Sequence, residues 1–255
     1  MIALVTLLCT LLVAVIAAPA DVAILDKRAK VIADGNRPHD GNLPDWDFKY
    51  HATGYVAKGC PTGTKITTCY DSRLSSDPAK NIENIGGHKI QSNLFYSSLK
   101  PGDGKIREYT FRMKVDPSFT SVSGDPYTLV GVETKTPTNT QERIMSAYIA
   151  INGNDDVGVY TYENPGVPVF AIPKSQYVGK RTLHTWKLDS TPSNGKITIK
   201  IIDDEDKSEI LTHTVPCPLI SGDYRMRVGT TREAVAGMSP LRIYWGSWSG
   251  KYVTS

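Results

Sequence analysis

Apolar and polar residues alternate with a period of two along much of this chain. In the segment 107–115, Tyr109, Phe111, Met113 and Val115 are separated by polar or charged residues. Successive side chains of a β-strand point to opposite faces, so this pattern predicts a strand with one buried face. Further strands are predicted between clusters of Gly, Pro, Asn and Asp, at 127–135, 144–151, 157–162, 183–188, 196–202, 209–215, 224–231 and 241–248.

The region 29–104 alternates less clearly, and its predicted strands cover 48–56, 65–70 and 88–95. No segment after Ala29 carries an apolar stripe at helical spacing. Many short strands separated by turn residues are typical of a sandwich or a jelly roll. The pattern therefore predicts an all-β fold, a single-domain β-jelly roll or concanavalin-like β-sandwich.

The first 28 residues have a different character. Residues 2–18 are almost entirely apolar, small residues follow at 18–20, and Lys27 and Arg28 form a dibasic pair. We interpret 1–20 as a signal peptide and 21–28 as a propeptide, followed by the domain at 29–255. A membrane anchor is the alternative, but the run is short for a bilayer and no basic cluster follows it directly. We expect a secreted, extracellular protein of fungal type.

Charge and composition narrow the class of partner. The formal net charge is only +3 over 255 residues, and the charges are spread along the chain. Such a small excess argues against nucleic acid as a partner. No second apolar run is long enough for a membrane. The expected protein is a monomer without nucleic-acid or membrane partners.

Three cysteines remain after the predicted signal peptide. Cys60 and Cys69 flank a Pro-Thr-Gly-Thr turn, so we predict a local disulfide between them in an oxidising compartment. Cys217 is then a free thiol or an alternative partner. No Cys-x-x-Cys spacing is present, so we expect no metal site, and nothing in the sequence requires an organic cofactor.

No specific catalytic motif is present. Gly-x-Ser-x-Gly, His-Glu-x-x-His and the phosphate loop are all missing from the sequence, which argues against esterases, zincin proteases and nucleotide enzymes. Glu133 stands in mid-strand and shares a face with Gly131, a residue that clears space. A desolvated carboxylic acid has a raised pKa and can act as a general acid. The alternative is an exposed or salt-bridged strand residue.

Other candidate residues follow from the same alternation. Arg225 and Arg227 alternate with apolar residues, so they lie on the face opposite the core and could hold an acidic sugar. Trp248 is out of phase with the core residue Trp245, so it offers a sugar-stacking platform or packs at an edge. Tyr148 could take part in β-elimination together with a histidine such as His88 or His184. The alternative is a structural role.

Several segments carry a family resemblance. They are Val31-Ile32-Ala33-Asp34-Gly35-Asn36-Arg37, Arg107–Met113 with Tyr127–Lys135, Thr185–Asp189 with 195–202, and Tyr224–Gly229 with Tyr244–Trp248. Their order resembles fungal glycoside hydrolase family 131, whose members are secreted β-jelly rolls that act on β-glucans. Jelly-roll polysaccharide lyases share the same strand order.

The resemblance implies a groove with two acidic residues, one of them on the strand that carries Glu133. The other belongs to an earlier strand that matches 88–94 here, where Gln91 and Asn93 stand in place of a carboxylate. Glycoside hydrolysis ordinarily needs two carboxyl groups. Glu108, Glu142 and Asp223 are candidate replacements for the second one.

These observations give one leading function and two alternatives. The leading hypothesis is a hydrolase of cell-wall β-glucan, with Glu133 as the catalytic residue. Its substrate-binding residues would be Gln91, Asn93, Tyr148, Arg225, Arg227 and Trp248. The alternatives are a polysaccharide lyase on an acidic glycan and a non-catalytic glycan-binding or effector protein.

Overall fold

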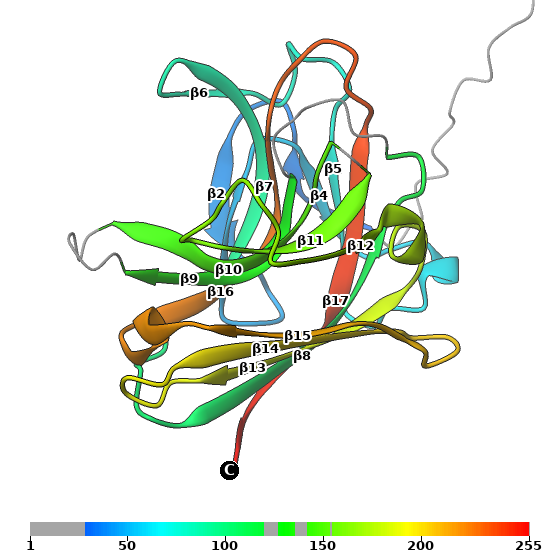
Figure 1. The fold of residues 1–255 in the computed structure, drawn as a ribbon. Helices are drawn as coiled ribbons and strands as arrows, with labels where there is room; N and C mark the ends of the chain where they lie inside the picture. The colour runs from blue at the N-terminus through cyan, green and yellow to red at the C-terminus, as the bar shows by residue number, and fades with distance from the viewer. Residues whose placement is uncertain (1–28, 120–126, 136–141, 154, 255) are drawn as a thin grey trace, which may run out of the picture.

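Two antiparallel sheets, packed face to face, make up the computed structural model (Figure 1). The structure describes residues 29–119, 127–135, 142–153 and 155–254. The predicted signal peptide and propeptide lie outside the described residues. Within these described residues, three short 3-10 helices accompany the strands: η1 (Thr62–Thr64), η2 (Lys174–Gln176) and η3 (Pro218–Ser221).

The first sheet has the strand order β1-β4-β5-β17-β8-β13-β14-β15. Its strands are β1 (Lys30–Asp34), β4 (Tyr55–Lys58), β5 (Cys69–Leu74), β17 (Leu241–Val253), β8 (Ile106–Val115), β13 (Thr182–Asp189), β14 (Lys196–Asp203) and β15 (Glu209–Pro216). In Figure 1 the strands β13, β14 and β15 form the lower layer. We call this the eight-stranded sheet.

The second sheet has the order β12-β11-β10-β9-β16-β7-β3-β2, and β6 pairs with β7. Its strands are β12 (Phe170–Pro173), β11 (Asp156–Thr161), β10 (Arg143–Ile151), β9 (Tyr127–Lys135), β16 (Tyr224–Glu233), β7 (His88–Ser97), β3 (Phe48–Ala52), β2 (His39–Asn42) and β6 (Glu83–Ile85). We call this the nine-stranded sheet. The predicted all-β, jelly-roll class is confirmed.

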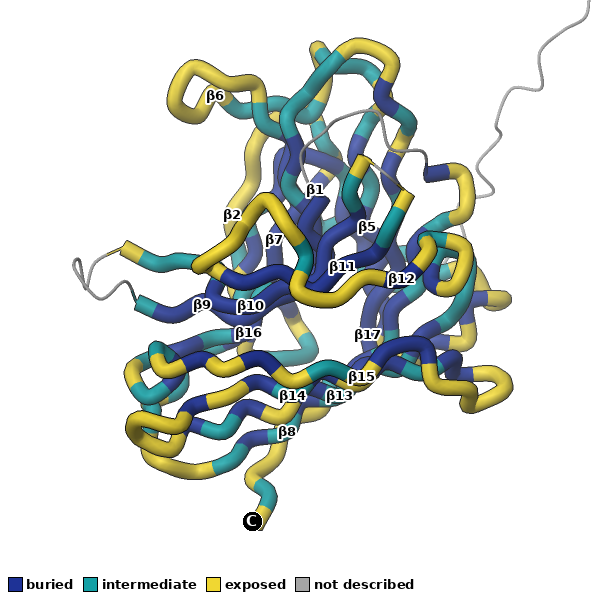
Figure 2. Tube along the Cα trace, viewed as in Figure 1, coloured by how far each residue is buried: buried dark blue, intermediate teal, exposed yellow. Residues whose placement is uncertain are grey.

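The core lies between the sheets and is built from alternate residues of their strands. The centre is aromatic: Trp245 of β17 is fully buried and lies 4.9 Å from Phe95 and 5.6 Å from Tyr70, between ring centroids. Figure 2 shows the alternation directly, since the trace of β14 and β15 switches between buried and exposed residues. Each sheet therefore has a core face and an outer face.

A β-bulge in β17 changes the prediction for Trp248. The register of β17 against β8 shifts between Gly246 and Ser249, and Ser247 has a positive φ of 54°. The extra residue rotates the following side chain to the other face. Trp248 consequently packs on the core side, with its ring centroid 4.8 Å from that of Phe48 and 5.5 Å from that of Phe111. Simple alternation predicts an outward side chain.

The disulfide prediction is confirmed, since Cys60 and Cys69 are bonded, and Cys217 is a buried free thiol. Within the described part of the chain, no helix is long and apolar enough to cross a membrane. The same residues contain no group of three or more His, Cys, Asp or Glu side chains placed to hold a metal ion.

His184 is a titratable residue within the core. It is fully buried, stacks on Phe111 at 4.7 Å, and lies 3.0 Å from the Tyr177 hydroxyl and 3.1 Å from the Thr182 hydroxyl. Burial lowers the pKa of His184 to about 3, because the charged ring would lose its hydration. The folded protein therefore keeps this histidine neutral.

We predict that His184→Gln weakens the pH dependence of stability. Below the ordinary histidine pKa the unfolded wild-type chain binds a proton that the folded chain does not, so stability falls as the pH falls. Between pH 7 and pH 5 this one group accounts for about 2 kcal/mol. Urea denaturation at both pH values gives the difference in unfolding free energy between pH 7 and pH 5. That difference should be smaller in the variant than in the wild type by this amount. An unchanged difference would contradict a neutral buried His184.

Candidate functional site

Glu133 lies near the end of β9 and points away from the core. Its neighbour Val132 is fully buried between the sheets, so alternation turns the Glu133 carboxylate to the outer face of the nine-stranded sheet. On the adjacent strand β16, Arg225 pairs directly with Glu133, and Arg227 is two residues further along. Three residues that the sequence placed on outward faces therefore meet at one point.

Both oxygens of the Glu133 carboxylate accept hydrogen bonds from arginine. Arg225 donates through Nε to Oε2 at 2.7 Å, and its Nη2 forms an ion pair with the same oxygen at 2.7 Å. Arg227 donates through Nη1 to Oε1 at 3.3 Å. The Glu133 side chain is 7% exposed, against 25% for Arg225. Because a guanidinium group donates and never accepts, these contacts suit an ionised carboxylate. Glu133 is thus a salt-bridged strand residue, one of the two interpretations of its sequence position.

A third arginine joins this cluster from β10. Burial lowers the pKa of Arg143, and the positive charge of Arg225 lowers it further, whereas Glu133 raises it. Within the described chain, the buried Arg143 Nη1 and the buried Arg227 Nε have no hydrogen-bond partner. Arg225 and Arg227 therefore share the Glu133 carboxylate, and the charge of Arg143 lies near them, under the influence of both Glu133 and Asp223. We call Glu133, Arg143, Arg225 and Arg227 the arginine cluster.

Aromatic rings flank the arginine cluster on both sides. The Arg225 guanidinium lies 4.2 Å from the ring centroid of Tyr96 on β7, a cation–π contact. On the other side, Tyr148 of β10 stacks on Tyr160 of β11 at 5.3 Å. Tyr148 is nearly buried, and its hydroxyl donates to the carbonyl of Pro165. Its ring is fixed on the outer face.

The strand register arranges these side chains in a line across the sheet. The paired positions run in the order Tyr160, Tyr148, Gly131, Arg227, Tyr96 and Lys49. At about 4.8 Å per strand the line is roughly 24 Å long. We call it the transverse row.

Gly131 is the one position in the transverse row without a side chain. A Cβ added there would lie 2.6 Å from the Cβ of Tyr148 and 2.2 Å from the terminal carbon of Met145. These distances are too short for any larger residue. The glycine therefore makes space, as the sequence predicts, and neighbouring side chains occupy that space.

A small cavity of about 270 Å³ adjoins the cluster at Arg225. Its charged and aromatic lining comes from Asp47, Lys49, Tyr96 and Arg225. Asp47 is exposed and precedes β3, so this cavity holds a second carboxylate on the same side of the sheet as Glu133. Sequence reasoning missed Asp47, Lys49, Tyr96 and Arg143, because only the pairing of distant strands brings them here.

Gln91 and Asn93 do not lie at the arginine cluster. Both are fully buried on the core side of β7. The Gln91 amide donates to the carbonyls of Ser75, Asp77 and Lys80, and its oxygen accepts from Arg232. These bonds fix the loop 75–82 to the sheet. The structure therefore gives Gln91 a supporting position, where the family resemblance implied contact with substrate.

Asn93 supports the neighbouring turn in the same way. Its oxygen accepts from the Gly54 amide, and its nitrogen donates to the Ser72 hydroxyl and to the carbonyls of Tyr55 and Arg73. All of these partners lie inside the fold. Asn93 is consequently not on a surface that a ligand could reach.

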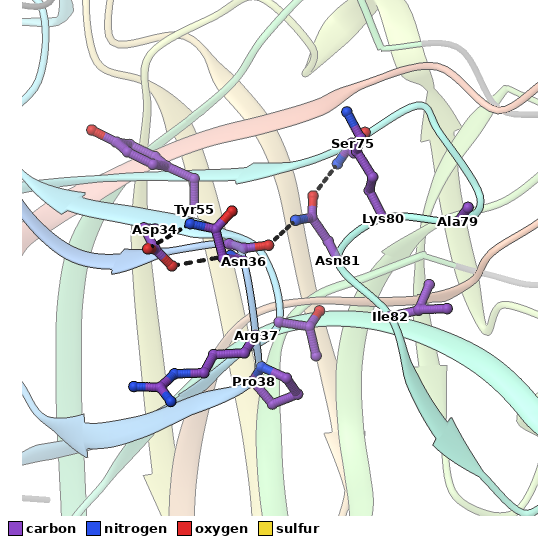
Figure 3. Close-up of a pocket in the computed structure, with 12 residues that line it drawn as sticks. Asp34, Asn36, Arg37, Pro38, Tyr55, Ser75, Ala79, Lys80, Asn81 and Ile82 are labelled. Atoms are coloured by element: carbon purple, nitrogen blue, oxygen red, sulfur yellow. Dashed lines mark hydrogen bonds between the residues drawn. The ribbon is translucent and has the colours of Figure 1, made fainter.

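The segments that Gln91 and Asn93 support enclose a different cavity, of about 450 Å³ (Figure 3). Asn81 crosses it, donating to the carbonyl of Gly35 and accepting from the Ser75 amide. Asp34 accepts from the backbone and side chain of Asn36, which lower its pKa. The acidic group of this cavity is thus engaged in its own turn.

The replacement acids named from the sequence lie in other surroundings. Glu108 is on β8 of the eight-stranded sheet, 3.2 Å from Lys251 and 3.7 Å from Lys187. Asp223 pairs with Lys135 at 2.8 Å, next to the strand ends that carry Glu133 and Arg225. Glu142 is exposed just before β10. None of them has an ion pair with the arginine cluster within the described residues.

Comparison with known proteins places this chain by its fold. No family model matches the sequence, and no curated protein matches it. Among solved structures, the alginate lyase AlgAT5 of polysaccharide lyase family 7 has a TM-score of 0.50 at 7% identity, covering 84% of this chain and 85% of its own. A second family 7 alginate lyase, solved with its substrate, has a TM-score of 0.52 at 8% identity, covering 75% and 81%.

The catalytic domain of the glycoside hydrolase family 131 protein from Coprinopsis cinerea is also similar, with a TM-score of 0.49 at 11% identity and 78% of each chain covered. At such identities the comparisons establish the jelly-roll fold.

We predict that Asn93→Ala lowers stability while an exposed neighbour does not. Removing the Asn93 amide leaves several buried backbone groups without partners, at a cost of about 2–4 kcal/mol in unfolding free energy. Lys49→Ala, at an exposed site on the same sheet, should change it by less than about 0.5 kcal/mol. Urea denaturation of both variants measures this. Wild-type stability of Asn93→Ala would contradict the supporting role.

Proposed function

We propose that this protein is a secreted carbohydrate-binding protein whose outer face of the nine-stranded sheet takes an acidic polysaccharide. The observation that supports it is the arginine cluster, in which Arg225 and Arg227 share one carboxylate and Arg143 adds a third guanidinium group whose Nη1 has no hydrogen-bond partner among the described residues. Arginine forms forked, charge-assisted hydrogen bonds with carboxylate groups. A uronate carboxylate would supply the acceptors that the chain itself does not provide.

Glu133 acts in this proposal as a positioning residue. It binds Arg225 through two nitrogens and Arg227 through one, so the orientation of both guanidinium groups is fixed before a ligand arrives. Fixing the donors beforehand reduces the entropy lost on binding. The tyrosine ring beneath Arg225 restrains it further.

The transverse row gives the site its extent. Tyr96 offers a partly exposed ring, and Arg227 and Lys49 offer charge, on the three neighbouring strands β16, β7 and β3, whereas Tyr148 and Tyr160 are buried. Aromatic rings combine an apolar body with a polar tip, which suits the mixed surface of a sugar. The exposed positions span roughly 10 Å across these three strands, which favours a ligand of more than one sugar. The fold likeness to two alginate lyases is compatible with an acidic polysaccharide as ligand.

Binding without elimination is what the side chains on this face support. Elimination needs a base at the sugar ring. Burial raises the pKa of Tyr96 and of Tyr148, so both phenols stay protonated at neutral pH. The two ring nitrogens of His51 on the same face are engaged with Asp40 at 2.9 Å and Glu83 at 3.0 Å. His184 is enclosed in the core.

Hydrolysis of a cell-wall glucan, with Glu133 as the catalytic residue, is the second candidate, and Asp47 favours it. Asp47 lines the cavity that Arg225 also lines, and Arg225 in turn binds Glu133. Glu133 would be one of the two carboxyl groups that glycoside hydrolysis requires, and Asp47 would be the other.

We predict that the protein, tested as residues 29–255, binds oligouronates and that the arginines carry the affinity. Isothermal titration with an oligogalacturonate or oligomannuronate should show saturable binding. Arg225→Ala and Arg227→Ala should each weaken it by about 10- to 100-fold, the loss expected for a charge-assisted hydrogen bond. Lys187→Ala, an exposed lysine on the eight-stranded sheet, is the matched control and should keep the wild-type affinity.

The same preparations separate the three functions. A rise in absorbance from unsaturated products would indicate elimination. Release of reducing ends from β-glucan would indicate hydrolysis, provided that the release is lost in Glu133→Gln and in Asp47→Asn. Binding of neutral β-glucan oligosaccharides with no affinity for oligouronates would overturn the acidic-ligand proposal.

A further inference from the structure

The outer face of the eight-stranded sheet carries a second charged hollow, of about 400 Å³. Four cationic side chains line it: Lys65, Arg112, Arg181 and Lys207. Arg112 is on β8 between the core residues Phe111 and Met113, so it points to the outer face of this sheet. The hollow is therefore on the opposite side of the sandwich from the arginine cluster.

Among the described residues that line the hollow, Asp204 is the single carboxylate, and it holds the cations in place. Its side chain is only 4% exposed, and it accepts from Arg112 Nε at 2.7 Å, Arg181 Nε at 2.8 Å and Lys207 Nζ at 2.8 Å. Burial raises the pKa of Asp204, but the hydrogen bonds from Arg112, Lys207 and Arg181 outweigh it and hold the pKa well below its usual range. Asp204 stays ionised and keeps both guanidinium groups in place.

The hollow has more positive charge than its own acid can balance. The four cations face one buried carboxylate; the exposed Glu205 adds a looser contact, 3.6 Å from Arg181 Nη1. Arg181 Nη1 itself is buried and makes no hydrogen bond within the described residues. Two or three positive charges therefore remain without a counterpart.

The donors also approach from separate elements. Arg112 is on β8, Arg181 immediately precedes β13, Lys207 is in the turn between β14 and β15, and Lys65 follows η1. The hydroxyls of Thr67 and Ser247, 2.8 Å apart, complete the lining. A planar carboxylate presents acceptors in one plane, whereas a tetrahedral oxyanion presents oxygens in several directions.

We propose that this hollow binds a tetrahedral oxyanion, the sulfate or phosphate group of a ligand, at a site separate from the arginine cluster. Arg112 and Arg181 donate to the oxyanion through guanidinium nitrogens that are not bonded to Asp204. Lys65, which is exposed, supplies a further positive charge. The proposal does not depend on what the other sheet binds.

The test uses the domain at 29–255 and inorganic phosphate and sulfate as probes, at constant ionic strength. Titration followed by NMR should shift the Arg112 and Arg181 Nε–H resonances with one saturating curve. Lys65→Glu leaves the bonds of Asp204 intact and should weaken binding by about tenfold. Lys187→Glu is the matched control, with the same change in charge on the same sheet face outside the hollow, and should stay within about twofold.

Two results would overturn the proposal. One is a set of NMR shifts that do not saturate in the wild type. The other is equal weakening of anion binding by Lys65→Glu and Lys187→Glu, which would indicate a non-specific effect of the net charge. Glucose 6-phosphate and glucose 6-sulfate distinguish the source of the anion. Tighter binding of these esters than of the inorganic ions supports a site for a saccharide-borne group, and equal binding supports a site for the free anion. Retained oligouronate binding in Lys65→Glu shows that the two sites are independent.

Discussion

The pairing of β16 with β9 is the constraint on which the candidate site depends. In this register Met226 and Val228 enter the core, while Arg225 and Arg227 meet Glu133 on the outer face. A slip of one residue would turn two arginines into an apolar interior, where unpaired charges are very costly. The ion pairs and the core thus specify the same alignment. The arrangement that holds the sheets together also delivers an excess of guanidinium groups to one surface point.

Much of this could be predicted from alternation alone. The segment 127–135 is the strand β9 as predicted, and the outward faces of Glu133, Arg225 and Arg227 follow from the period of two. Their convergence could not be predicted, because β9 and β16 are separated by most of the second half of the chain. Asp47 and Tyr96 were missed for the same reason, since strand order is a non-local property.

Three candidate binding residues lie away from the arginine cluster for identifiable physical reasons. The bulge at Ser247 inverts the side of Trp248, and a bulge leaves no mark in simple alternation. Gln91 and Asn93 are polar residues on a core face, where their partners are carbonyls and amides of loops distant in sequence. A buried amide with all its hydrogen bonds made looks, in sequence, like a polar residue on a surface. Only the tertiary contacts distinguish the two.

The molecule presents different chemistry on its two outer faces. One bears the arginine cluster in a row with aromatic rings, and the other bears lysines and arginines around Asp204 without aromatic neighbours among its lining residues. In both, a nearly buried carboxylate holds arginines that have donors to spare. The central claim is that the arginine cluster binds the carboxylate of an acidic glycan. A crystal structure with a bound oligouronate tests it most directly. The account predicts a sugar carboxylate within hydrogen-bond distance of Arg225 or Arg227, with the glycan chain lying over Tyr96 and Lys49. A ligand seated in the cavity of Figure 3, with the arginine cluster untouched, would contradict it.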